Sequence, residues 1–133
     1  MMQTGKENLI VSLTFEFSLL IIEYTELLES KRKYTLANQL FKSGTSIGAN
    51  VREAQNAESK NDFIHKMKIS AKETDETEYW LKLCKASPSY PDTTILLEKI
   101  ESINKVLSKI IASSKKDEVL KTSSNYQITK SSN

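Results

Sequence analysis

Apolar residues recur every three or four positions along four segments of the chain, a spacing typical of helices that bury one face. The predicted helices cover roughly residues 9–30, 35–57, 60–86 and 93–116, and no segment alternates in the manner of a half-buried strand. Only short connections lie between them. Four amphipathic helices joined in this way favour an all-α, up-down-up-down four-helix bundle.

The ends of the predicted helices carry signals of their own. Ser59 begins a capping box that opens the third helix, and two prolines place a turn at 87–92. The basic run at 31–33 follows the first helix, where cations favour the helix dipole. Residues 117–133 are rich in Lys, Ser, Thr and Asn. We therefore expect a bundle over 1–116 and a polar, weakly ordered C-terminal tail.

The apolar stripes identify the expected core. On the second, third and fourth helices they comprise Leu36, Leu40, Gly44, Ile47, Val51 and Ala54; Phe63, Met67, Ser70, Thr74, Leu81 and Cys84; and Leu96, Ile100, Ile103, Leu107 and Ile110. The first helix has two apolar lines. The line that we expect to face the core comprises Leu9, Leu13, Phe17, Leu20, Tyr24 and Leu27.

Two helices carry more apolar surface than one bundle seam needs. The second line on the first helix comprises Val11, Phe15, Leu19 and Ile22. The third helix has Ile69, Trp80 and Leu83 away from its main stripe. Exposed apolar patches of this size normally meet a partner. We therefore expect a homo-oligomer that buries Trp80 or Phe15 at a subunit boundary.

Two of the three glycines, Gly44 and Gly48, lie one turn apart within the second predicted helix. Glycine inside a helix costs about 0.5–1 kcal/mol relative to alanine. Both fall along one edge of the apolar stripe, so the missing Cβ would let another helix approach closely, within the bundle or between subunits. A phosphate-cradling loop is not favoured, because it needs a preceding strand and a Gly-Lys-Ser/Thr ending.

Charge is unevenly distributed along the chain, although the net charge is only +2. Residues 1–29 carry one lysine and five glutamates, whereas residues 30–72 carry nine Lys or Arg and three Asp or Glu. A basic stripe repeated around an oligomer would attract nucleic-acid phosphates. The candidate contacts are Lys42 and Arg52 on the outer side of the second helix, and Lys68 and Lys72 on the third. A solvated face with no ligand is the simpler interpretation of the same charges.

The residues give little support to an enzyme, a metal site or a cofactor. His65 is the only histidine, whereas a di-iron bundle needs Glu-x-x-His on two helices. Cys84 has no basic partner at helical spacing other than lysines, which favours a buried apolar role. The longest apolar run, 19–22, is too short to cross a bilayer. With one cysteine and no convincing signal peptide, we expect a cytoplasmic protein without membrane contact.

Two consecutive stretches then show a family resemblance. Residues 34–54 read YTLANQLFKSGTSIGANVREA, and residues 59–83 read SKNDFIHKMKISAKETDETEYWLKL. The first contains SIxAN followed by a glutamate, and the second contains a Lys-Glu-x-x-Glu-Thr-x-Tyr-Trp-Leu run. In this order they resemble the bacterial 23S rRNA intervening-sequence proteins, a family related to the accessory variability proteins of diversity-generating retroelements. The resemblance covers about residues 8–112.

The resemblance implies a four-helix bundle assembled into a pentameric ring, with no known catalysis. In the retroelement branch it also implies binding of nucleic acid and of a reverse transcriptase. Asn50, Glu53 and Glu76 match the Asn and Glu positions of the family pattern. They lie at the margins of apolar stripes, where we expect polar pairs that fix the register of the helices.

The predicted function is therefore a non-enzymatic, oligomeric binding protein that engages RNA or DNA through a basic face, beside a protein partner such as a reverse transcriptase. The alternative is a protein-binding scaffold with no role in nucleic-acid binding. The two predict different responses to salt, because binding to phosphates weakens as salt rises.

Overall fold

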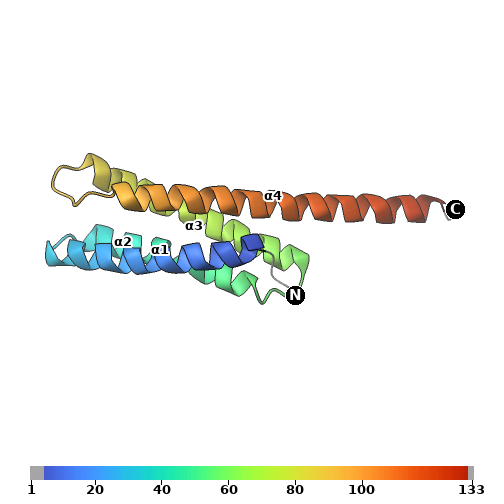
Figure 1. The fold of residues 1–133 in the computed structure, drawn as a ribbon, viewed down its shortest axis with the longest axis horizontal. Helices are drawn as coiled ribbons and strands as arrows, with labels where there is room; N and C mark the ends of the chain where they lie inside the picture. The colour runs from blue at the N-terminus through green and yellow to red at the C-terminus, as the bar shows by residue number, and fades with distance from the viewer. Residues whose placement is uncertain (1–4, 132–133) are drawn as a thin grey trace.

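The computed structural model describes the backbone of residues 5–131 and the side chains of residues 9–117. It consists of four helices: α1 (Gly5–Ser30), α2 (Tyr34–Ala54), α3 (Lys60–Ala86) and α4 (Thr94–Ser131). Successive helices run in opposite directions (Figure 1). Each packs on the next, and α1 also packs on α4, which closes the bundle. The predicted four-helix architecture is confirmed, with no strand among the described residues.

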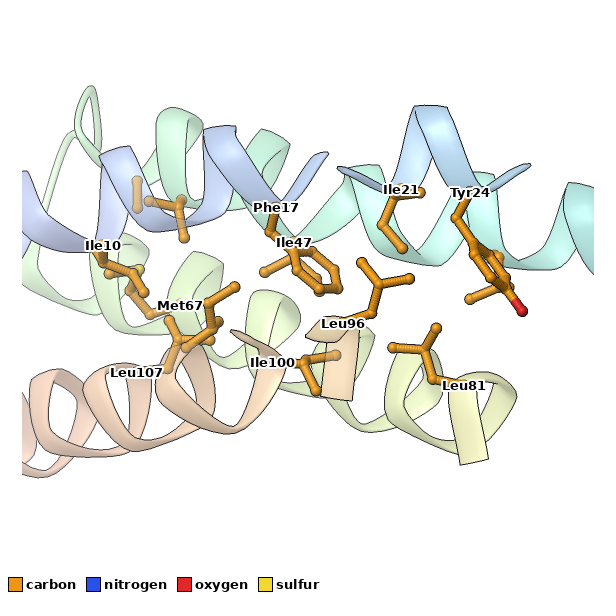
Figure 2. Packing of buried hydrophobic residues seen from close by; sticks show 14 of the residues in the cluster. Ile10, Phe17, Ile21, Tyr24, Ile47, Met67, Leu81, Leu96, Ile100 and Leu107 are labelled. Atoms are coloured by element: carbon orange, nitrogen blue, oxygen red, sulfur yellow. The ribbon is translucent and has the colours of Figure 1, made fainter. Parts of the chain in front are cut away.

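The core lies along the axis of the bundle, where side chains from all four helices meet (Figure 2). The predicted stripes of α3 and α4 are confirmed, because every one of their residues is buried. On α2 the stripe is also correct except at its first position, since Leu36 is half-buried and Ala37 takes its place in the core. The three- and four-residue spacing identified these faces, including that of α3, which also carries Ile69, Trp80 and Leu83 outside its stripe.

The face predicted for α1 is only partly correct, because Phe17 and Tyr24 are buried but the other core residues of this helix lie outside the predicted line. The core line on this helix is Ile10, Thr14, Phe17, Ile21, Tyr24 and Leu28. Leu9 and Leu27, which we expected to be buried, are 47% and 42% exposed. Because α1 is apolar on more than one side, the spacing of its residues does not determine its rotation in the bundle. Contacts with α2 determine it instead.

Gly44 and Gly48 make those contacts. A Cβ built on Gly44 would lie 2.8 Å from Cγ1 of Ile21, and one on Gly48 would lie 3.2 Å from the backbone oxygen of Thr14. Both neighbours belong to α1. The predicted close helix packing is thus confirmed, and the structure places it within the bundle, between α1 and α2.

Buried hydroxyl groups link α2 to α3. The Oγ of Ser70 donates to the backbone oxygen of Ile47 at 2.9 Å. The hydroxyls of Thr77 and Ser43 are 2.8 Å apart, and both residues are almost fully buried. Each such pair satisfies polar groups only at one alignment of the two helices, so these bonds fix their register.

The turns between helices follow their local sequence signals. Residues 31–33 form the turn after α1, in which the Lys33 amide donates to the Leu28 oxygen at 2.9 Å and Arg32 has a φ of 61°. This is a Schellman-type cap with arginine at the left-handed position, where glycine is usual. At the start of α3 the predicted cap is confirmed, since the Ser59 hydroxyl accepts from the Asp62 amide.

The last helix does not end near residue 116. The last buried residue described on α4 is Ser114, but the helix continues to Ser131 and projects past the ends of the other three helices (Figure 1). Residues 117–131 continue α4 past residue 116, where we expected the bundle to end and a weakly ordered tail to begin. They contain no proline or glycine, so no residue in this segment breaks the helix. We call residues 115–131 the arm.

Candidate nucleic-acid interface

The four basic residues predicted to contact nucleic acid are all exposed, but they do not form one patch. Lys42 and Arg52 are ten residues apart on α2, which separates them by about 80° around the helix. Arg52 lines a groove of about 180 Å³ between α1 and α2, together with Phe15 and Gly48. The helix that carries Lys68 and Lys72 packs on α2 and α4 but not on α1. Arg52 therefore belongs to a different surface from the α3 lysines.

Helix α4, which packs on α3, carries lysines that the sequence analysis did not single out. Residues 102–116 of α4 contain four lysines and no acidic residue, namely Lys105, Lys109, Lys115 and Lys116. All four side chains are exposed. Three of them follow one another at intervals of four and seven residues, which keeps them near one face of the helix. This spacing, which is visible in the sequence, could have identified a basic stripe on α4.

The lysines of α3 and α4 lie at the same level of the bundle. Figure 2 shows Met67 of α3 beside Leu107 of α4, and both are fully buried. Lys68 directly follows Met67, while Lys105 and Lys109 stand two residues on either side of Leu107. The core contact thus aligns two lysine-bearing segments that are about 40 residues apart in sequence. We call these exposed lysines, Lys68, Lys72, Lys105 and Lys109, the basic face, in which Lys105 also pairs with the Glu101 carboxylate at 3.4 Å.

Only one of the three residues expected to fix helix register links two helices. Glu53 pairs with Lys66 of α3 at 3.3 Å, but the pair is solvent-accessible and contributes little to stability. The Asn50 amide donates within its own helix, to the Ser46 oxygen at 2.8 Å. Glu76 is exposed. The expected register role is therefore taken by the buried hydroxyls, because short hydroxyl side chains reach a facing backbone without burying a charge.

Glu76 instead affects its neighbour Glu73, one turn away on α3. Burial raises the pKa of Glu73, and the adjacent Glu76 carboxylate raises it further, while Lys72 lowers it. Two carboxylates on the same turn repel each other when both are ionised. This acidic pair directly follows Lys72 in the sequence, so acidic side chains come after the lysines along α3.

Phe15 and Trp80 differ in their surroundings. Phe15 is 63% exposed on α1. Trp80 is half-buried against its own core, its ring lies 5.3 Å from that of Tyr79, and its buried indole nitrogen has no hydrogen-bond partner within residues 9–117. Much of the indole therefore lies inside the protomer, and Phe15 is the more accessible of the two predicted contact residues.

Two grooves run between α1 and α4. Two adjoining hollows of about 430 and 290 Å³ share Leu20, Glu23 and Ile95. Their walls are mainly leucine and isoleucine, and Ile95 is 64% exposed. An apolar groove with glutamates at its edge is a surface suited to another protein.

The described residues do not assemble a catalytic set. Burial raises the pKa of the Cys84 thiol, so it stays protonated, and the Tyr24 hydroxyl beside it donates to the backbone of Pro91 at 2.7 Å. Burial also raises the pKa of Tyr24. Within the described part of the chain, no three His, Cys, Asp or Glu residues are placed to hold a metal ion. No described helix is long and apolar enough to span a bilayer.

These features define a small four-helix-bundle protein whose exposed surface combines clustered lysines with an apolar groove. The chain belongs to the 23S rRNA-intervening sequence protein family, whose model matches residues 6–110. It is similar to a solved protein of unknown function from the S23 ribosomal protein family of Bacteroides thetaiotaomicron. That similarity has 37% identity and a TM-score of 0.76, and it covers 80% of this chain and 98% of the other. No curated protein matches the chain.

Proposed function

We propose that this protein is a non-enzymatic homo-oligomer, pentameric as its family resemblance implies, that binds nucleic acid through phosphate contacts. The observation that carries the proposal is the basic face, whose exposed lysines are close in sequence to the buried Met67 of α3 and Leu107 of α4. Lysine supplies a point charge without a fixed geometry, so it favours phosphates over base edges. Contacts of this kind suit a protein that binds nucleic acid without recognising its base sequence.

Oligomerisation would multiply the effect of a modest charge. One protomer carries a net charge of only +2, which steers a polyanion weakly. In a ring, identical basic faces are repeated around the axis and their fields add over a Debye length of about 8–10 Å. The exposed Phe15 and Leu19 of α1 would be covered by a neighbouring subunit in such a ring. The resemblance adds a further partner, a reverse transcriptase of the retroelement type.

The test is binding of fluorescently labelled RNA and DNA, measured by anisotropy between about 50 and 200 mM salt. The logarithm of the affinity should fall linearly with the logarithm of the salt concentration. Replacing Lys68, Lys105 and Lys109 by glutamine should reduce the slope by about 0.7–0.9 for each lost phosphate contact. The matched control replaces Lys31, Lys82 and Lys99, which are also exposed. Equal slopes in the two triple variants, or no binding by the wild type, would refute the proposal.

A protein-binding scaffold is the second candidate, favoured by the α1/α4 groove. Leu19, Leu27 and Ile95 lie at this groove and remain substantially exposed. Binding there would depend on apolar contact and would survive the salt that removes nucleic acid. An Ile95→Lys variant should lose a protein partner and keep its salt-dependent nucleic-acid affinity, whereas a basic-face variant should show the opposite pattern.

A further inference from the structure

The arm lies outside the part of the chain that the family model matches. The family model ends at residue 110, and the solved relative is matched over 98% of its own length by only 80% of this chain. The family model therefore covers the bundle and does not cover the arm. The arm, residues 115–131, continues α4 beyond it with no other helix alongside (Figure 1).

The composition of the arm does not suit packing against a protein. Its apolar residues Val119, Leu120, Tyr126 and Ile128 follow one another at intervals of one, six and two positions, so they define no continuous apolar stripe at three- and four-residue spacing. The other residues include four lysines, two acids and seven uncharged polar residues. A single helix that is polar on all sides is marginally stable in water. Such a helix gains most from a partner that is itself highly charged.

The lysines of the arm extend the line that begins on the bundle. Lys105, Lys109 and Lys116 follow at intervals of four and seven residues, and Lys130 comes fourteen residues later, about four turns of helix. From first to last the line spans about 37 Å at 1.5 Å per residue, the length of roughly ten base pairs of duplex. Serine, threonine, asparagine and glutamine between the lysines are the other common donors to phosphate and sugar.

We propose that the arm is a nucleic-acid-binding extension of the bundle, which lengthens the phosphate contact from the basic face along α4. This inference rests on the proposed function, because it assumes that the bundle binds nucleic acid at the basic face. The arm would add affinity and length to the contact, and it would leave the oligomer unchanged, since the shared bundle lies within residues 6–110.

The experiment compares three full-length proteins: wild type, an arm variant with Lys116, Lys121 and Lys130 replaced by glutamine, and the triple variant of the basic face. Anisotropy with single-stranded RNA, single-stranded DNA and duplex DNA gives the salt slope for each. We expect the arm variant to lower the slope by about 1.4–1.8, because two of its three lysines, Lys116 and Lys130, belong to the line. Circular dichroism and light scattering check that fold and mass are unchanged. Nucleic acid should also slow tryptic cleavage at the three arm lysines of the wild type.

The outcomes separate the two proposals. If the arm variant keeps the wild-type slope while the basic-face variant loses it, the arm has no role and the proposed function stands. If the wild type itself does not bind any of the three probes, both proposals are wrong. If the arm variant changes the mass of the assembly without changing the salt slope, the arm is a subunit contact and this inference is overturned.

Discussion

Filling the space at Gly48 tests the helix contact most directly. In a solvated helix, Gly→Ala stabilises by about 0.4–1 kcal/mol because alanine restricts the unfolded chain. Here the new Cβ would lie 3.2 Å from the Thr14 oxygen and 3.4 Å from the Ser18 hydroxyl. The Thr14 oxygen belongs to the α1 backbone and cannot rotate away, so α1 itself must shift.

The balance of these effects should be unfavourable. Overpacking a tight contact costs about 1–3 kcal/mol, which exceeds the propensity gain, so we expect Gly48→Ala to destabilise the protein by about 1 kcal/mol. Gly44→Ala should cost more, because its Cβ would come within 2.8 Å of the fully buried Ile21. Gly48→Leu should be worse than either, since a leucine has no space to enter between the two helices.

Chemical denaturation followed by circular dichroism measures these differences, and light scattering reports the mass. Ala49→Gly is the matched control, because Ala49 is exposed one position further along α2 and should show only the propensity cost of about 0.5–1 kcal/mol. Because the contact lies within one protomer, unfolding and loss of mass should coincide. A Gly48→Ala protein more stable than wild type would show that α1 and α2 are not held at this distance.

For three further substitutions, the structure predicts whether the protein is stabilised or destabilised. Arg32→Gly should stabilise the turn after α1 by up to about 1 kcal/mol in denaturation, because φ is 61° there; a loss of stability would contradict the cap. Thr77→Val should cost about 1–3 kcal/mol by leaving the buried Ser43 hydroxyl without its partner; a neutral effect on the melt would contradict the register role. Glu73→Gln should stabilise the fold at neutral pH, because burial and Glu76 raise the pKa of Glu73 and so disfavour its ionised form in the folded state. That gain should vanish below about pH 4, where the wild-type carboxyl is protonated whether folded or unfolded; a pH-independent gain in the melts would contradict this cause.

Sequence patterns were sufficient where a helix has one apolar face. The stripes from Phe63 to Cys84 and from Leu96 to Ile110 were predicted correctly and are buried. The end of α4 was not predicted, because polar composition was taken as a sign of disorder, whereas a helix needs a breaker such as glycine or proline to end sharply. The segment 117–131 has none.

The candidate site was harder to predict for a different reason. Lys68 and Lys72 were identified from local charge, but their neighbours Lys105 and Lys109 depend on how α3 and α4 align. That alignment is a property of core packing, here the contact of Met67 with Leu107 (Figure 2). A charge count along the chain grouped Lys42 and Arg52 with the α3 lysines because they are near in sequence, although Arg52 lies at the α1/α2 groove.

The glycines of α2 connect the core to the outer surface. Helix α1 is apolar on more than one side, so the spacing of its apolar residues alone does not determine its rotation. Gly44 provides room for Ile21, and Gly48 allows the backbone at Thr14 to approach. Together the two glycines favour the rotation of α1 that buries the line from Ile10 to Leu28. The same rotation turns Phe15 and Leu19 outward, where they are 63% and 49% exposed. The surface proposed for self-association is thus a consequence of two missing side chains on the neighbouring helix. A variant that fills Gly44 should therefore disturb both the core and the assembly, whereas Phe15→Lys should disturb the assembly alone.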